Sequence, residues 1–142
     1  MYGALYIARK EDSPEVILDP TKKKFSITGM SMPEDSLTFY RPIIQWFEEY
    51  VKQPFDRLCL DIKLLYFNTA SAKEIARTLA TLYDCDQHEK ITVRWFYDHN
   101  DPENLDCCVR YEHIPLKYEY YEFDFSTLDP PDEPEGTYHI IR

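Results

Sequence analysis

The order of hydrophobic and polar residues predicts strands at the start of the chain. Short apolar runs occupy residues 5–8, 16–18 and 25–27, and the turn-forming sequences EDSP and DPTKKK separate them. Apolar runs of this length, bounded by turn residues, are typical of β-strands. We therefore expect the chain to begin with a small antiparallel sheet.

The clearest helical pattern lies in MPEDSLTFYRPIIQWFEEYV, residues 32–51. Apolar side chains recur there at intervals of three and four residues, which places them on one face of a helix. The members of this face are Leu37, Tyr40, Ile44, Phe47 and Val51. A proline at position 42 lies inside the pattern, so we expect a bent axis or a separate first turn.

The second half of the chain predicts strands that alternate with helices. RLCLDIKLLYF (57–67) has the pattern of a long central strand, and residues 72–82 repeat apolar side chains with helical spacing. ITVRWFY (91–97) reads as another strand, and Asp101 with Pro102 suits the start of a short third helix. IPLKYEYYEF then alternates as a final edge strand. This order predicts an α/β fold, a single domain with a mixed β-sheet and helices packed against it.

The composition fits one folded domain that ends in an acidic extension. The 142 residues are 44% hydrophobic and 15% aromatic, which is enough to build a core without disulfides. From Glu119 onward acidic residues dominate, Arg142 is the only basic one, and three prolines interrupt the chain. We therefore expect a domain over residues 1–123 and an acidic, proline-containing C-terminal extension over residues 124–142.

The charge and hydropathy of the chain disfavour nucleic acid and membranes as partners. Its formal net charge is −10, so a phosphate backbone or an anionic membrane surface would be repelled. The one dense basic run, residues 22–24, reads as an exposed hairpin turn. No signal-peptide pattern and no run of about 18 apolar residues is present. We expect a cytoplasmic protein that does not insert into a membrane.

No cofactor, metal site or catalytic motif is predicted. The four cysteines lack CxxC spacing, the four histidines share no element with ligand spacing, and GxSxG, HExxH and Walker sequences are absent. The carboxylates of Asp98, Asp101 and Glu103 could bind a divalent cation, although a solvated acidic loop explains them better. Two alternatives therefore stand: a small metal-dependent enzyme using Asp98 to Glu103, and a scaffold that oligomerises through its last strand and acidic tail.

The sequence YFNTASAK, residues 66–73, joins the long strand to the second helix. One interpretation is a simple helix start, in which Ser71 is the N-cap and Glu74 completes an S-x-x-E capping box. That interpretation gives no role to Asn68 and Thr69. Both residues follow a central strand, at the position where open α/β sheets usually carry their binding sites. A hydroxyl there faces the positive end of the helix dipole, which favours an added phosphate. From the residues alone, two interpretations of this segment remain: a simple helix cap and a phosphorylation site.

Four segments of the chain match one known family when they are taken together. They are SPEVILDP (13–20), ITGMSMPEDSLTFYRPIIQWFEEYV (27–51), YFNTASAKEI (66–75) and ITVRWFYDHNDPENLD (91–106). In this order, within residues 4–123, they resemble the SiaC family of bacterial biofilm-regulating phosphoproteins. The elements G-x-S-x-P-E and Y-F-N-T-x-S-x-K are specific in combination. The resemblance implies a fold similar to STAS-type anti-sigma-factor antagonists, and a partner-switching signalling protein without catalysis of its own.

The resemblance also implies a phosphorylation site. In the SiaC family the threonine of the FNT element is phosphorylated by a dedicated serine/threonine kinase and dephosphorylated by a PP2C-type phosphatase. The matching residue is Thr69, with Ser71 as the alternative, and Asn68 and Ser71 would shape its turn while Lys73 helps to hold the phosphate. The unphosphorylated form would bind and activate a diguanylate cyclase, which promotes cyclic di-GMP signalling and biofilm formation, and phosphorylation would release it.

The helices that start near Ser36 and Ser71, with the loop over residues 29–35, are expected to present the partner surface. The candidate residues are Gly29, Ser31, Pro33, Glu34, Tyr40 and Trp46. Gly29 would also supply an unusual backbone angle, and Glu34 could instead only stabilise the positive end of the helix. Core packing is the ordinary role of a tryptophan, but Trp46 falls off the apolar face of its helix, which makes it a candidate interface residue.

Overall fold

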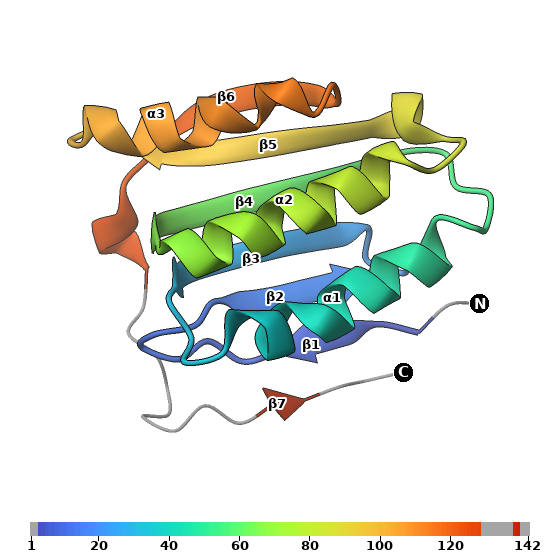
Figure 1. Cartoon of the computed structure of the whole chain (residues 1–142), viewed down its shortest axis with the longest axis horizontal. Helices are drawn as coiled ribbons and strands as arrows, with labels where there is room; N and C mark the ends of the chain where they lie inside the picture. The colour runs from blue at the N-terminus through green and yellow to red at the C-terminus, as the bar shows by residue number, and fades with distance from the viewer. Residues whose placement is uncertain (1–2, 129–137, 140–142) are drawn as a thin grey trace.

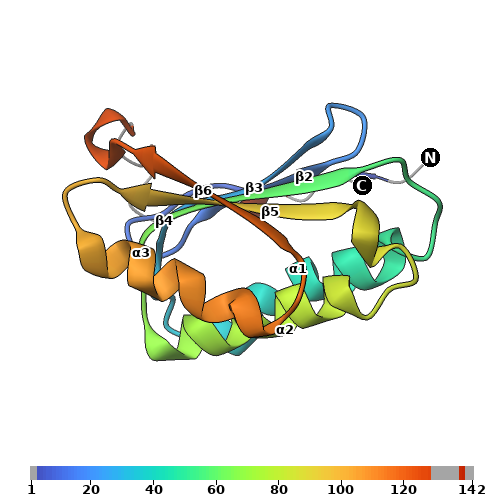
Figure 2. The same cartoon turned by 90° about the horizontal axis from the view of Figure 1, so that it is seen from above.

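The computed structural model describes residues 3–128 and 138–139, which form a mixed sheet with helices on one face (Figures 1 and 2). The strands are β1 (Leu5–Ile7), β2 (Glu15–Asp19), β3 (Lys24–Ser31), β4 (Leu58–Phe67), β5 (Ile91–Asp98), β6 (Lys117–Phe123) and β7 (Tyr138–His139). The helices are α1 (Ser36–Tyr50), α2 (Thr69–Tyr83) and α3 (Pro102–Val109), with short 3-10 turns η1 (His88–Lys90), η2 (Arg110–His113) and η3 (Phe125–Thr127). The predicted α/β class and single mixed sheet are confirmed.

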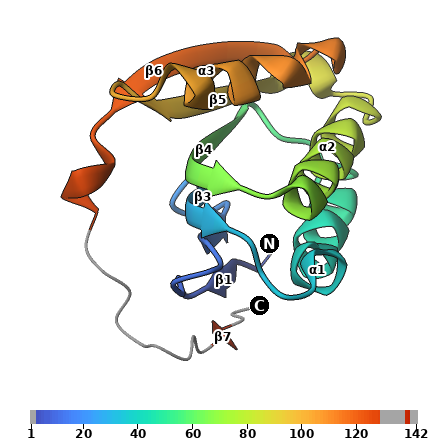
Figure 3. The same cartoon turned by 60° about the vertical axis from the view of Figure 1, so that its left-hand side comes forward.

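The strand order explains why the three helices cover the same face. The order is β6-β5-β4-β3-β2-β1-β7, with antiparallel pairing from β1 to β3 and parallel pairing from β3 to β6. Each parallel connection carries one helix and moves one strand further in the same direction. Crossovers of one hand that move in one direction place their helices on one side of the sheet. The carboxyl ends of β3 and β4 therefore meet the starts of α1 and α2 at one end of the molecule (Figure 3).

The core lies between the sheet and the helices. In β4, alternate side chains from Leu58 to Leu64 are buried against the helices, as the predicted strand requires. Trp95 of β5 is fully buried and stacks on Tyr111 of η2, with ring centroids 5.2 Å apart. This stacking holds the segment after α3 against the sheet.

Helix α1 buries much of the predicted face, since Tyr40, Phe47 and Val51 lie in the core, but its buried face also includes Phe39, Ile43 and Trp46. It runs without interruption through Pro42, so the first turn is not separate, and Asp35 caps it by accepting a hydrogen bond from the Thr38 backbone N–H at 3.1 Å. Leu37 is 49% exposed, whereas Trp46 is only 6% exposed and donates its indole N–H to the Gly3 carbonyl at 2.9 Å. The predicted interface role of Trp46 is therefore wrong. The buried face is rotated by about one residue because the aromatic side chains pack on the sheet.

The chain continues to pack on the domain beyond residue 123. Phe125 of η3 is buried and meets the Phe123 ring edge-on at 4.9 Å. Further on, the β7 backbone pairs antiparallel with β1, at the edge of the sheet opposite β6. Most of the predicted acidic extension lies outside the described residues. None of the described helices has the length and apolarity that a bilayer span requires.

Candidate functional site

The FNT element lies where β4 ends and α2 begins. The Asn68 side-chain oxygen accepts a hydrogen bond from the Ser71 backbone N–H at 2.8 Å, and its carbonyl accepts one from the Ala72 N–H at 2.8 Å. Its own N–H donates to the Ser31 carbonyl at 3.0 Å, which ties the helix start to the end of β3. Asn68 is therefore the N-cap, and the capping box predicted for Ser71 and Glu74 is wrong. Asparagine is among the best N-caps, so one residue satisfies this helix start.

Thr69 is the first residue of α2, and its side chain is exposed. None of the described residues hydrogen-bonds its hydroxyl, so the oxygen is free to react. The partial positive charge of the helix start and its backbone N–H groups favour an anion at this position. The site thus combines access with an environment suited to a phosphate.

Ser71 is fully buried, unlike Thr69. Its hydroxyl accepts a hydrogen bond from the Ser31 hydroxyl at 2.8 Å and lies 3.2 Å from the Ser36 hydroxyl. The Ser31 hydroxyl also lies 2.7 Å from the Tyr40 hydroxyl. Burial raises the pKa of Tyr40 far above its usual range, so this phenol stays protonated. A kinase would have to open the first turn of α2 to reach Ser71.

Glu74 lies beside this hydroxyl cluster and is itself buried, with 6% of its surface exposed. One carboxylate oxygen is 3.4 Å from the Arg77 guanidinium, and the other has no hydrogen-bond partner among the described residues. The carboxylate also contributes to the raised pKa of Tyr40. The interface between α1 and α2 already contains one poorly compensated negative charge.

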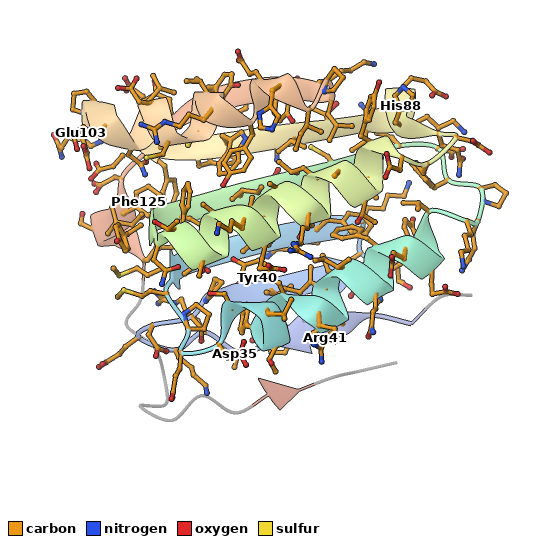
Figure 4. The ribbon with its side chains drawn as sticks, in the orientation of Figure 1. Asp35, Tyr40, Arg41, His88, Glu103 and Phe125 are labelled. Carbon is orange, nitrogen blue, oxygen red and sulfur yellow. The ribbon has the colours of Figure 1, made fainter. Side chains whose placement is uncertain are left out.

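The predicted partner residues divide into a buried and an exposed group. Gly29 has the positive φ of 131° that was expected, and a Cβ there would lie 2.7 Å from the Arg9 side chain. Gly29 is buried with Ser31, Tyr40 and Trp46, so these four side positions are not exposed in this structure and instead pack within β3, α1 and the core. Pro33 is half-buried and Glu34 is exposed, so only these two keep a surface position. Figure 4 labels Asp35, the N-cap of α1, and Tyr40 in the first turns of that helix.

Three exposed apolar side chains, Met32, Leu37 and Tyr66, lie on neighbouring elements at the same end of the molecule as Thr69, and we call them the apolar patch. The exposed fractions of these side chains are 36%, 49% and 50%. β3 pairs with β4 up to Ser31 and Phe67, and the hydroxyl of Ser36 contacts Ser71, so all three elements meet here. Clustered exposed apolar side chains mark interaction surfaces.

A register shift in β4 explains why Tyr66 was not among the predicted partner residues. Gly29 pairs with Leu64, but the next residue of β3, Met30, pairs with Tyr66, so β4 has one extra residue at this point. The extra residue reverses the alternation of side chains. Phe67 consequently packs near the rings of Trp95 and Tyr111, while Tyr66 turns to the surface.

The carboxylates near α3 have structural roles. Asp101 caps α3 by accepting a hydrogen bond from the Glu103 backbone N–H at 3.1 Å, and Asp98 accepts one from the Asn100 N–H at 3.0 Å. Within residues 3–128, no three histidine, cysteine, aspartate or glutamate side chains are placed to hold a metal ion. The alternative of a metal-dependent enzyme has no support in this geometry.

The Asn68 cap can be tested by its contribution to stability. We expect Asn68→Ala to lower the free energy of unfolding by about 1 kcal/mol, because the first turn of α2 loses its side-chain acceptor. Asn68→Ser, which can still cap, should retain most of that stability. Urea denaturation monitored by circular dichroism would measure both. Equal stability of the two variants would show that Asn68 does not stabilise α2 by capping.

A mixed sheet that places an accessible threonine at a helix start, beside an apolar patch, is the arrangement of a small regulatory α/β domain. The family model described as SiaC family regulatory phosphoprotein matches residues 7–123. The chain therefore belongs to the SiaC family of regulatory phosphoproteins, as the sequence motifs predicted. It is also 32% identical over 95 residues to an uncharacterized protein of Pseudomonas aeruginosa strain UCBPP-PA14, covering 66% of this chain and 75% of that protein.

Solved structures of family members share the fold. SiaC of Pseudomonas aeruginosa superposes with a TM-score of 0.75 at 26% identity, over 84% of this chain and 98% of that one. A crystal structure of the diguanylate cyclase SiaD in complex with its activator SiaC, also from Pseudomonas aeruginosa, gives a TM-score of 0.77 at 26% identity, over 84% and 99% of the two chains. The likeness thus covers nearly the whole of each relative.

Proposed function

We propose that this protein binds and activates a diguanylate cyclase in its unphosphorylated form. The observation that carries the proposal is the likeness to SiaC, which is the activator of the cyclase SiaD in the matched complex. The output would be cyclic di-GMP and, through it, biofilm formation. The protein would act by binding rather than by catalysis.

The control that we propose is phosphorylation of Thr69 by a serine/threonine kinase, reversed by a PP2C-type phosphatase. The exposed, unbonded hydroxyl of Thr69 and the burial of Ser71 support this choice between the two candidate residues. Both the kinase and the cyclase consume nucleoside triphosphates, so we place the protein in the cytoplasm. The four free cysteines agree with that reducing compartment.

The partner surface that we propose is the apolar patch together with Pro33 and Glu34. The patch and the start of α2 lie at the same end of the molecule, so we expect a phosphate on Thr69 to lie at the border of the contact. Apolar side chains at the centre of an interface contribute most of its binding energy. This surface keeps only Pro33 and Glu34 of the predicted partner residues, but it lies in the same region of the fold.

The patch can be tested with a charged substitution. We expect Leu37→Asp to weaken binding to the cyclase at least about 10-fold, because a carboxylate would replace an exposed apolar contact, with no loss of fold. The matched control is Tyr121→Asp on β6, an exposed large side chain of 41% exposure outside the patch. Isothermal titration calorimetry with the cyclase would compare them. Equal affinity of both variants would remove the patch from the interface.

A further inference from the structure

Two grooves flank α2, and they differ in charge. The groove between α1 and α2 is lined by Glu48, Glu74 and Asp84, which offset its two arginines. The groove between α2 and the α3–η2 segment, with a volume of about 400 Å³, includes Lys73, Arg110 and His113 and no carboxylate. Thr69 lines this second groove, which we call the basic groove. In a chain of net charge −10, a groove with only basic ionised side chains is not expected from composition.

The walls of the basic groove are fixed to each other. The Tyr111 hydroxyl donates to the carbonyl of Ala72 at 3.0 Å, which joins η2 to the first turns of α2. The Tyr111 ring is held in turn by stacking on Trp95. His113 Nδ1 lies 2.8 Å from the carbonyl oxygen of Arg110, which fixes the imidazole at the end of the segment. The groove is therefore already formed before any ligand enters.

The two permanent cations of the groove are uncommitted. Within the described residues, neither Lys73 nor Arg110 takes part in an ion pair, whereas Arg94 and Arg77 each have a carboxylate partner. Lys73 lies four residues after Thr69, so the two side chains extend from the same face of α2. A guanidinium can bind a phosphate through two parallel hydrogen bonds, which is the strongest arrangement available to a side chain.

We propose that the basic groove receives the phosphoryl group of phosphorylated Thr69 in the same molecule. Lys73 and Arg110 pair with its oxygens. This inference rests on the proposed modification of Thr69, and it gives the phosphorylated state a structure of its own. The carboxylates of the other groove repel the phosphate, so it turns towards α3 and links η2 to α2. A phosphate bound in this way is partly screened from solvent and from a phosphatase.

The test measures the ionisation of the phosphate directly. The full-length chain is prepared with phosphothreonine incorporated at position 69 during translation, and its second pKa is followed by phosphorus-31 NMR. We expect this pKa to lie about 1 unit below the usual value near 6, because neighbouring cations favour the doubly charged form. The double variant Lys73→Gln, Arg110→Gln should raise it again by most of this difference, leaving only the smaller effect of the start of α2.

The control variant carries the same change of net charge elsewhere. Arg41→Gln, Lys117→Gln removes one cation from the other groove and one from β6, and it should leave the lowered pKa in place. A pKa at the usual value in the native sequence would overturn the proposal. An equal rise in both double variants would also overturn it, because only the overall charge would then be acting.

The outcome is independent of the cyclase. If the pKa is lowered and depends on Lys73 and Arg110, the basic groove binds the phosphate, even if phosphorylation leaves cyclase binding unchanged and the proposed function fails. Phosphorylation could instead release the cyclase while the phosphate pKa does not change when Lys73 and Arg110 are replaced. The proposed binding of the phosphate in the basic groove would then be wrong, and the proposed function would stand.

Discussion

Phosphorylation of Thr69 is expected to weaken binding to the diguanylate cyclase by at least about 100-fold. The phosphate adds about −1.5 to −2 charges at the border of the apolar patch. Burying such a group in an interface costs several kcal/mol unless the partner supplies compensating charges, and about 3 kcal/mol corresponds to this loss of affinity. If the phosphate instead lies in the basic groove, it is already paired there and is not available to partner cations.

Calorimetric titration of the cyclase with four forms of the chain would measure this effect. Unmodified protein and Thr69→Ala should bind equally tightly, because the exposed hydroxyl makes no hydrogen bond among the described residues. Thr69→Asp should bind more weakly, but less so than phosphothreonine, since it carries a single charge and a shorter side chain.

The matched control for charge alone is phosphothreonine at position 21. Thr21 is exposed in the turn between β2 and β3, at the opposite end of the sheet from Thr69. Phosphate there should leave the affinity almost unchanged. Equal binding by unmodified and Thr69-phosphorylated protein would exclude Thr69 from the switch.

The sequence predicted the elements that depend on local patterns. The alternation in β4 and the Asp101–Pro102 start of α3 were correct, because each follows from spacing or capping within a few residues. The buried face of α1 was predicted only in part: Tyr40, Phe47 and Val51 are buried, but Leu37 is exposed, because the sheet beneath the helix sets the phase of the face. Two helical faces one residue apart were both apolar enough to be buried, and only tertiary contacts choose between them.

The candidate site divides in the same way. The location of the FNT element was predicted from its position between a strand and a helix. The identity of the N-cap residue was not, because Asn68 and Ser71 are both good N-caps. Which of the two residues caps the helix depends on Ser31 and Ser36. Their hydroxyls, from β3 and α1, contact the hydroxyl of Ser71. Likewise, nothing near Thr69 in the sequence indicates Arg110, since only the packing of η2 against α2 brings it to the groove.

The distinction between Thr69 and Ser71 leads to the second large effect. We expect Ser71→Asp to lower the free energy of unfolding by about 3 kcal/mol or more, because it places a charge in a fully buried position without a cation. The buried carboxylate of Glu74, one helical turn further on, adds repulsion. Thr69→Asp should be neutral or slightly stabilising, because an exposed carboxylate at the first position of α2 complements the helix dipole.

Urea denaturation of the two variants beside Ser71→Ala would separate charge from lost hydrogen bonds. Ser71→Ala leaves the hydroxyls of Ser31 and Ser36 without this partner and should cost about 1–3 kcal/mol. The added loss in Ser71→Asp should shrink from about pH 7 to about pH 4.5. Burial raises the folded-state pKa of the new carboxyl, so the folded state gains a proton before the unfolded state does.

A Ser71→Asp variant as stable as Thr69→Asp would mean that position 71 can open to accept charge, and Ser71 would regain its place as a phosphorylation site. The expected instability has the opposite meaning. A phosphate on Ser71, with twice the charge, would separate α1 from α2 and destroy the surface that binds the partner. A phosphate on Thr69 can instead change that surface while the core stays intact, which a reversible switch requires because the phosphatase must recover a folded protein.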